Sequence, residues 1–208
     1  PTSTYHHNSG GDPEAIPDLS YDQLMAFYKG HYHPSNAILL TFGNLPVSQH
    51  HDVFERDALG RFEKSSEQIE VGLEVPFSEP RRAAHCYALE DTDTADKTHL
   101  IMGWKLGESS DLDTLLEAQL LSSVLMENSA SPLMQWLETN DLGAAPSPLC
   151  GLEDSMREMV LCCGIEGSNE EHANAFETQV LAVIRAVSDD GVSPERLEPI
   201  LHLSLIPI

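Results

Sequence analysis

Histidine is the residue type in this sequence best suited to binding a metal, and its ten copies include three close groupings. The groupings are His6-His7, His31 with His33, and His50-His51. A zinc site needs three or four converging ligands, two of which commonly lie one helical turn apart. No grouping has the i, i+4 spacing of H-E-x-x-H, and the reversed motif H-x-x-E-H does not occur in the sequence. We therefore interpret these histidines as surface or turn residues.

Nucleophilic and phosphate-binding motifs are also incomplete. Ser9-Gly10-Gly11-Asp12 lacks the Lys-Ser/Thr of a P-loop. It also lacks the preceding strand and following helix of a dinucleotide-binding motif, so a sharp turn explains the two glycines better. No serine occupies the centre of a G-x-S-x-G motif. The four cysteines have no C-x-x-C spacing, and this usage is typical of reduced thiols. Cys162 and Cys163 are predicted to point to opposite faces of an apolar strand and to be inert core thiols. The residues alone give no complete catalytic site.

The charge of the chain argues against two classes of partner. Acidic residues number 34 against 11 basic residues, which gives a formal net charge of -23. Nucleic acid binding depends on clustered Lys and Arg, and an anionic membrane surface would repel this chain, so we predict neither as a partner. The acidic residues are dispersed, which favours a solvated surface; the alternative is a field that attracts cationic substrates. No segment approaches 18 apolar residues and no targeting signal is visible, which predicts a soluble intracellular protein.

Three elements are well specified near the start of the chain. Ser20 and Gln23 have the spacing of a capping box, which predicts a helix that ends near Gly30. After a turn, the continuous apolar run 37–42 predicts a central strand that is covered on both faces. Ser48 is expected to cap a second helix.

From residue 82 onward, strand-like and helical segments alternate. We predict four strands, over 85–89, 98–104, 147–152 and 156–165. We also predict four helices: one over 111–126, one from Pro132 toward Gly143, one from a Ser168/Glu171 capping box to Gly191, and one from Pro194 onward. Strands that return around amphipathic helices in this order indicate an α+β fold, with layers of antiparallel sheet and helices.

The residues near the start of the chain also resemble a known protease family. The resemblance rests on Tyr5-x-x-Asn8-Ser9-Gly10-Gly11-Asp12-Pro13, Ile16-Pro17-Asp18-Leu19, His31-Tyr32-His33-Pro34-Ser35-Asn36-Ala37 and Phe42-Gly43-Asn44. These motifs closely resemble the presequence protease branch of the pitrilysin/insulinase family of zinc metallopeptidases. A looser resemblance continues through Ser129-Ala130-Ser131-Pro132-Leu133 and Leu142-Gly143 to about His202.

The resemblance implies a division of the chain into four parts. Residues 1–62 are expected to be the C-terminal part of a first, catalytic-type peptidase domain, and residues 63–81 an interdomain linker. Residues 82–202 are expected to form a second, non-catalytic domain of the insulinase/processing-peptidase type. Residues 203–208 depart from the family and are expected to be a truncated or foreign end. The sequence opens in loop-like residues without Met, so we expect a fragment of a longer protein.

The resemblance further implies a zinc-dependent metalloendopeptidase that degrades short unstructured peptides inside a chamber of related domains. The zinc site of this family consists of an H-x-x-E-H motif and a further glutamate, and both are expected before Pro1. Zinc is therefore expected in the full-length parent and not in this fragment. No catalytic or metal-binding residue of the family maps onto this chain, and its substrate-binding residues are unknown. The fragment is expected to be a chamber wall that contacts the remaining domains of the same polypeptide and is inactive alone. The parent is expected in the cytoplasm if bacterial, and in the mitochondrial or plastid matrix if eukaryotic.

The resemblance also assigns a counterpart to the zinc helix. In this family the second domain is a degenerate copy of the first, so the helix over 111–126 corresponds to the first domain's zinc helix. The register places Gln119-Leu120-Leu121-Ser122-Ser123 at the positions of H-x-x-E-H. Amides and hydroxyls are poor zinc ligands and do not take a proton from water near neutral pH. The second copy is therefore expected to be non-catalytic. The alternative is that the whole protein is a non-catalytic scaffold or interaction subunit of a peptidase-like complex.

Overall fold

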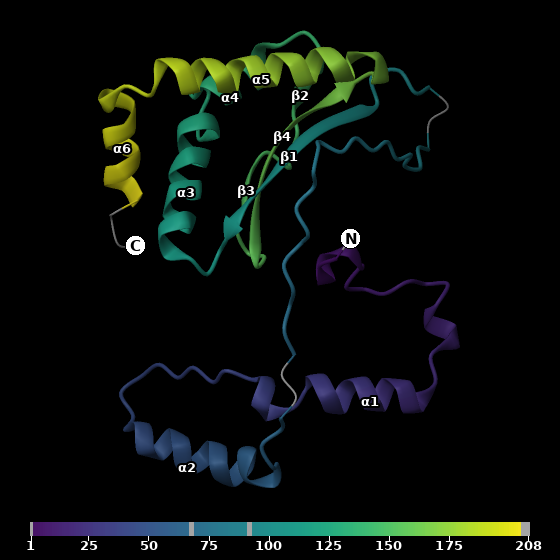
Figure 1. The fold of residues 1–208 in the computed structure, drawn as a ribbon, viewed down its shortest axis with the longest axis vertical. Coiled ribbons are helices and arrows are strands. Elements are labelled where there is room, and N and C mark those ends of the chain that lie inside the picture. The colour runs from purple at the N-terminus through teal and green to yellow at the C-terminus, as the bar shows by residue number, and fades with distance from the viewer. Residues whose placement is uncertain (1, 67–68, 91–92, 205–208) are drawn as a thin grey trace. The chain divides into compact units, whose positions relative to one another are not determined.

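The structure, a computed structural model, describes residues 2–66, 69–90 and 93–204, with only the backbone at 203 and 204. The chain divides into two units, Pro1–Pro76 and Phe77–Ile208 (Figure 1). The four-part division into domains, linker and foreign end stays a prediction. Residues 205–208 of that end lie outside the described residues.

The first unit contains the helices α1 (Tyr21–His31) and α2 (Val47–Asp57). Short 3-10 turns flank them at Thr4–His6, Ile16–Asp18, Pro34–Asn36 and Leu59–Arg61. The capping box of α1 is confirmed, because Gln23 N–H donates to Ser20 Oγ at 3.3 Å and Ser20 N–H donates to Gln23 Oε1 at 2.8 Å. The predicted cap of α2 is wrong, since Pro46 occupies the N-cap position and Ser48 lies in the first turn.

The apolar run 37–42 does not form the predicted buried strand. It joins no sheet within the described part of the chain, and the side chains of Ile38, Leu40 and Phe42 are 96%, 90% and 101% exposed. A strand needs a neighbour for its N–H and C=O groups and a covering layer for its side chains. No described residue of the first unit is buried, so this unit supplies neither the neighbour nor the layer.

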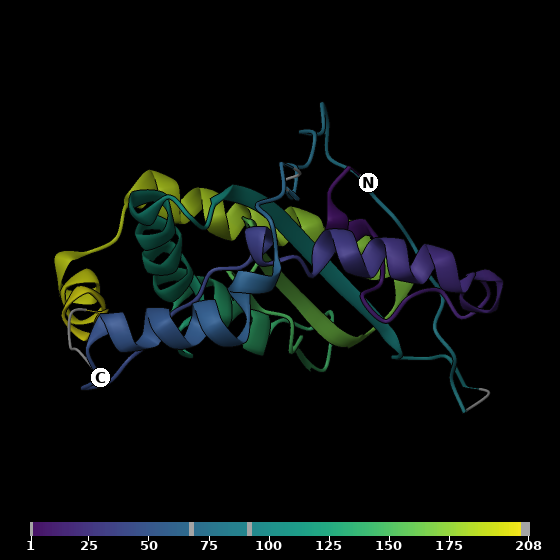
Figure 2. The same cartoon turned by 90° about the horizontal axis from the view of Figure 1, so that it is seen from below.

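The second unit combines an antiparallel sheet with helices. Its strands are β1 (Thr98–Glu108), β2 (Ala145–Pro146), β3 (Gly151–Glu153) and β4 (Glu158–Ser168). Its helices are α3 (Leu112–Met126), α4 (Pro132–Thr139), α5 (Ala173–Asp190) and α6 (Pro194–Ser204). Strand β4 pairs antiparallel with each of the other three strands, and β1 follows it over most of its length, as Figure 1 and Figure 2 show. The predicted α+β fold class is confirmed.

The core of the second unit joins β4 to α3, α4 and α5. Strand β1 contributes with the period of two expected of a half-buried strand, because Leu100, Met102 and Trp104 pack against the core while the residues between them are exposed. The buried cluster comprises Leu125, Met126, Leu133, Leu137, Leu161, Cys163, Ile165, Phe176 and Val180. Full burial of one large apolar side chain contributes about 1.5–3 kcal/mol. This cluster therefore fixes the helices on the sheet.

Three local predictions in the second unit are wrong. Residues 85–89 form no strand, and the predicted strand over 147–152 is replaced by the short strands β2 and β3. Ser168 is not a helix cap, because it ends β4 and its hydroxyl donates to the carbonyl of Leu142 at 2.6 Å. A 3-10 turn at Glu170–His172 then leads into α5. The predicted end of α5 at Gly191 and the start of α6 at Pro194 are confirmed.

Candidate functional site

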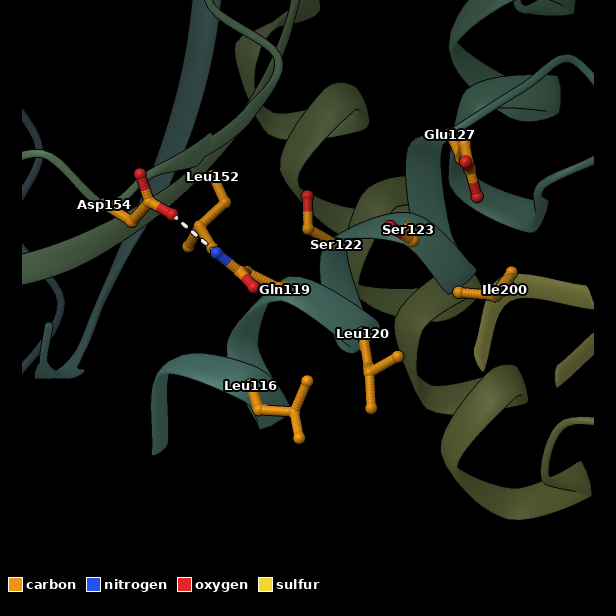
Figure 3. Close-up of a pocket in the computed structure, with 9 residues that line it drawn as sticks. All are labelled: Leu116, Gln119, Leu120, Ser122, Ser123, Glu127, Leu152, Asp154 and Ile200. Carbon is orange, nitrogen blue, oxygen red and sulfur yellow. Dashed lines mark hydrogen bonds between the residues drawn. The ribbon is translucent and has the colours of Figure 1, made fainter. Parts of the chain in front are cut away.

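A cavity of about 460 Å³ lies beside helix α3 (Figure 3). Its wall consists of Leu116, Gln119, Leu120, Ser122, Ser123 and Glu127 from α3 and its C-terminal end, Leu152 and Asp154 from β3 and the turn after it, and Ile200 from α6. Helix residues three or four positions apart project from the same side, which is the spacing of Leu116, Gln119 and Ser123. Gln119, Ser122 and Ser123, the residues that the family resemblance is expected to align with H-x-x-E-H, all line this cavity.

Helix α3 is held at its start and along its buried side. The carboxylate of Asp111 caps the helix, accepting from Asp113 N–H at 3.2 Å and from Thr114 N–H at 3.4 Å. On the core side, Ala118 and Leu125 are buried. Because both the start and the core side are fixed, the cavity side of α3 has a defined orientation.

The side chain of Gln119 points toward Asp154 (Figure 3). Gln119 Nε2 donates to Asp154 Oδ2 at 3.0 Å. Asp154 lies in the turn between β3 and β4, where hydrogen bonds from the hydroxyl and the N–H of Ser155 hold the pKa of Glu153 below its ordinary value. The turn therefore carries adjacent carboxylates, and one of them reaches the cavity.

The donor groups of the cavity do not fit a zinc ion. Gln119 offers an amide, and Ser122 and Ser123 offer hydroxyls, where a zinc peptidase needs two imidazoles and a basic carboxylate. Across the ranges that the structure describes, no three His, Cys, Asp or Glu side chains are placed to share a metal ion. The cavity can form hydrogen bonds to a ligand, but its described lining residues make neither a metal centre nor hydrolytic machinery.

His31 and His33 lie at the end of α1 and at the start of the turn after it, whereas His50 and His51 lie in helix α2. His33 Nδ1 accepts from Ser35 N–H at 3.1 Å, at the start of a 3-10 turn. His31 stacks on Phe27, with 3.7 Å between the ring centroids. In the predicted glycine turn, Gly11 has a φ of 86°, a left-handed conformation that favours glycine. These contacts give the residues structural roles in the first unit.

The four cysteines are free thiols. Burial raises the pKa of Cys163 to about 12 and also raises the pKa values of Cys150 and Cys162. Cys162 and Cys163 lie on opposite sides of β4. Cys163 belongs to the buried cluster, whereas Cys162 is half-buried and lies outside it, so the predicted core position holds for Cys163 alone. Because the thiolate is the reactive form, these raised pKa values make the three thiols poor nucleophiles near neutral pH.

Sequence reasoning missed Asp154 and a second cavity. Asp154 lies 35 positions from Gln119, and no local motif links the two residues. The second cavity, of about 730 Å³, lies between the C-terminal ends of α3 and α5 and the starts of α4 and α6. Its charged lining residues are Glu127 and Arg196. Both cavities depend on the packing of helices, which periodicity alone does not specify.

The fold is an α+β domain, and the cavity beside α3 is lined by an amide, hydroxyls, carboxylates and apolar side chains. The family model described as "Peptidase M16 inactive domain" matches residues 18–202. The chain therefore belongs to the M16 peptidase family, and the predicted family resemblance is confirmed.

Curated relatives of the chain are mitochondrial presequence proteases. The protein from Xenopus laevis is 32% identical over 204 residues, which cover 97% of this chain and 20% of the relative. The protein from Aspergillus oryzae is 34% identical over 198 residues, which cover 94% of this chain and 19% of the relative. The chain thus spans about a fifth of the length of these relatives. The crystal structure of a protease from Helicobacter pylori shares the fold, with a TM-score of 0.59 and 17% identity over 91% of this chain and 44% of that chain.

Proposed function

We propose that this chain is part of a zinc metallopeptidase that degrades short unstructured peptides, and that it supplies a non-catalytic wall of the peptide chamber. The observation that carries the proposal is the cavity beside α3, whose described lining includes Gln119, Ser122 and Ser123 and no imidazole. In the proposed alignment, these three residues take the positions of H-x-x-E-H. The relatives are presequence proteases, which supports the peptidase assignment, and the description of the matching family model as an inactive domain supports the non-catalytic role. The catalytic chemistry belongs to the rest of the polypeptide.

The first unit supports the proposed contacts with further domains. Ile38, Leu40 and Phe42 expose apolar side chains that soluble proteins normally cover. We assign residues 1–62 to the end of a catalytic-type domain, 63–81 to a linker and 82–202 to the non-catalytic domain. In this assignment, residues elsewhere in the polypeptide cover the apolar run of the first unit.

The proposed location of the protein in the cell depends on whether its source is eukaryotic or bacterial. The relatives are named as mitochondrial, so the mitochondrial matrix is the proposed location if the source is eukaryotic, and the cytoplasm if it is bacterial. Among the residues described by the structure, no helix is both long and apolar enough to cross a membrane.

A peptide-cleavage assay tests the proposal. The purified 208-residue chain is incubated with an internally quenched unstructured peptide and zinc, with and without a chelator. We expect no cleavage above the buffer rate in either case, because the cavity lacks zinc ligands and a base. The full-length protein is the positive control and should cleave the peptide until chelator is added. Chelator-sensitive cleavage by the 208-residue chain would contradict its non-catalytic role.

The gene sequence before Pro1 separates the proposal from the scaffold alternative. An intact H-x-x-E-H motif there is required by the peptidase assignment, because this chain offers no substitute for it. If the gene lacks the motif, the peptidase assignment fails and a non-catalytic scaffold or interaction subunit becomes the better account.

A further inference from the structure

We propose that the cavity between the ends of α3 and α5 and the starts of α4 and α6 binds short apolar peptides whose two termini are free. In this proposal, Arg196 binds the terminal carboxylate of the peptide and Glu127 binds its terminal ammonium group. Glu127 also lines the cavity beside α3 and therefore lies at the boundary between the two cavities. The inference goes beyond the proposed function, because it concerns binding and needs no catalytic residue.

The cavity has the size and the apolar lining of a small-molecule site. Its volume is about 730 Å³, within the range of about 300–1,000 Å³ that is usual for ligand pockets. Its larger apolar lining residues are Val124, Pro132, Val187, Val192, Pro199 and Ile200. All of these except Pro199 are half-buried, so an apolar ligand in the cavity would remove more of their surface from water.

The uncharged polar groups of the lining form hydrogen bonds within the protein. The hydroxyl of the buried Ser131 accepts from Asn128 N–H at 3.3 Å, and Asn128 Oδ1 accepts from Ala130 N–H at 2.9 Å. The carbonyl of Ser193 accepts from Arg196 N–H at 3.0 Å. These bonds fix the loop between α3 and α4 and the start of α6. The charged side chains are therefore the main groups left for recognition of a polar ligand.

Two opposite charges reach the cavity from different elements. Glu127 is the C-cap residue of α3, and Arg196 lies in the first turn of α6. Within the described residues, neither side chain forms an ion pair. A ligand that satisfies both carries an anion and a cation, joined by an apolar body. A short apolar peptide with free termini has this composition, because near neutral pH its carboxyl group is ionised and its amino group is protonated.

Other small ligands match the lining less well. A fatty acid offers an anion alone and leaves Glu127 without a partner. A free amino acid carries both charges but has too little apolar surface to cover the lining. Hydrolysis of a peptide bond creates one new carboxylate and one new amino group, so it releases molecules of the proposed kind. The origin of the ligand in this protein's own reaction rests on the proposed function.

Calorimetric titration of the 208-residue chain with trileucine tests the site. Trileucine amide lacks the carboxylate, and N-acetyl-trileucine lacks the ammonium group. We expect one trileucine per chain, and about threefold weaker binding of each blocked peptide, since one charge pair is then lost. Leucine and octanoate should bind at least about tenfold more weakly than trileucine. Absence of saturable trileucine binding, or equal binding of leucine or octanoate, would overturn the inference.

Substitutions test which terminus each charged residue binds. Arg196→Gln should weaken binding of trileucine about threefold and leave binding of trileucine amide unchanged. Glu127→Gln should weaken binding of trileucine by a similar factor and leave binding of N-acetyl-trileucine unchanged. Both positions are exposed, so the variants should fold, which circular dichroism checks.

Two matched variants control for the loss of a charge. Arg185→Gln and Glu117→Gln replace exposed residues that do not line the cavity, and they should bind trileucine as the wild type does. Weaker binding by these controls would show that the overall charge of the chain decides the affinity, which overturns the inference. Equal losses for the free and the blocked peptide in Arg196→Gln or Glu127→Gln would also overturn it.

The binding test and the cleavage test can fail separately. Absence of trileucine binding would leave the peptidase assignment intact, because the proposed catalytic groups lie elsewhere in the polypeptide. Failure of the peptidase assignment would leave trileucine binding in place, and would remove only this protein's own reaction as the source of the ligand.

Discussion

Asp96 and Asn169 are joined by two hydrogen bonds, although 73 positions separate them in the sequence. Asn169 Nδ2 donates to Asp96 Oδ1 at 2.7 Å, and Asp96 N–H donates to Asn169 Oδ1 at 3.0 Å. Asp96 has a φ of 56°, a left-handed conformation that aspartate tolerates better than most residues. The pair connects the loop before β1 to the turn after β4, next to the paired residues Thr98 and Ser168.

Loss of this link should loosen the end of the sheet. We expect Asn169→Ala to lower the free energy of unfolding of the second unit by about 1–2 kcal/mol, since two hydrogen bonds disappear. Urea unfolding monitored by tryptophan fluorescence measures this, because both tryptophans, Trp104 and Trp136, lie in the second unit. Asn174→Ala, at an exposed position of α5, is the matched control and should change the value by less than about 0.5 kcal/mol. Equal effects of the two substitutions would contradict the role of the link.

The buried thiol of Cys163 should make stability depend on pH in the alkaline range. Burial raises its pKa from 9.0 to about 12, so as pH rises the unfolded chain loses this proton before the folded chain does. The stabilising contribution is therefore complete below pH 9 and is lost progressively as pH rises toward 12. In that window this one group lowers the free energy of unfolding by about 1.4 kcal/mol per pH unit.

Replacement of the thiol should remove that slope. Cys163→Ala is expected to be less stable than the wild type at neutral pH, because a buried side chain is shortened, but its stability should fall less steeply above pH 9. Urea unfolding midpoints measured at several alkaline pH values give the dependence of stability on pH for the wild type and for Cys163→Ala. Cys86→Ala, which removes an exposed thiol, should keep the wild-type slope. A Cys163→Ala slope equal to that of the wild type would show that another group is responsible.

The exposed apolar run of the first unit should drive self-association of the chain. Ile38, Leu40 and Phe42 are almost fully exposed, and such a segment is prone to pair with another chain. We expect the triple variant with serine at these positions to sediment as a smaller species than the wild type at the same concentration. Its second unit should keep the wild-type urea midpoint.

A matched triple variant tests whether the location of these side chains is important. Ile69, Leu73 and Val75 are also apolar but are only 48%, 45% and 59% exposed. Serine at these three positions should reduce self-association less than serine in the 37–42 run does. If both triple variants behave alike, general surface hydrophobicity and not the run itself causes the association.

Local features of the structure were predictable because short-range interactions specify them. The capping box of Ser20 and Gln23, the proline at the start of α4 and the glycine after α5 each depend on residues a few positions apart. The family could be predicted for a similar reason, since its motifs are contiguous stretches of sequence. The α+β class followed from the alternation of elements.

Features that depend on distant partners were decided only by the tertiary structure. The run 37–42 has the composition of a buried strand, but the described residues provide no neighbouring strand, so its hydrogen-bonding groups and side chains stay uncovered. Ser168 had the spacing of a helix cap, but its position at the end of β4 directs its hydroxyl to Leu142. The correspondence of Gln119 and Ser123 to zinc-binding histidines came from the family resemblance and stays a prediction. Only the packing of α3 beside the β3–β4 turn brought Asp154 to Gln119, because contacts between distant residues depend on how the whole unit closes around its core.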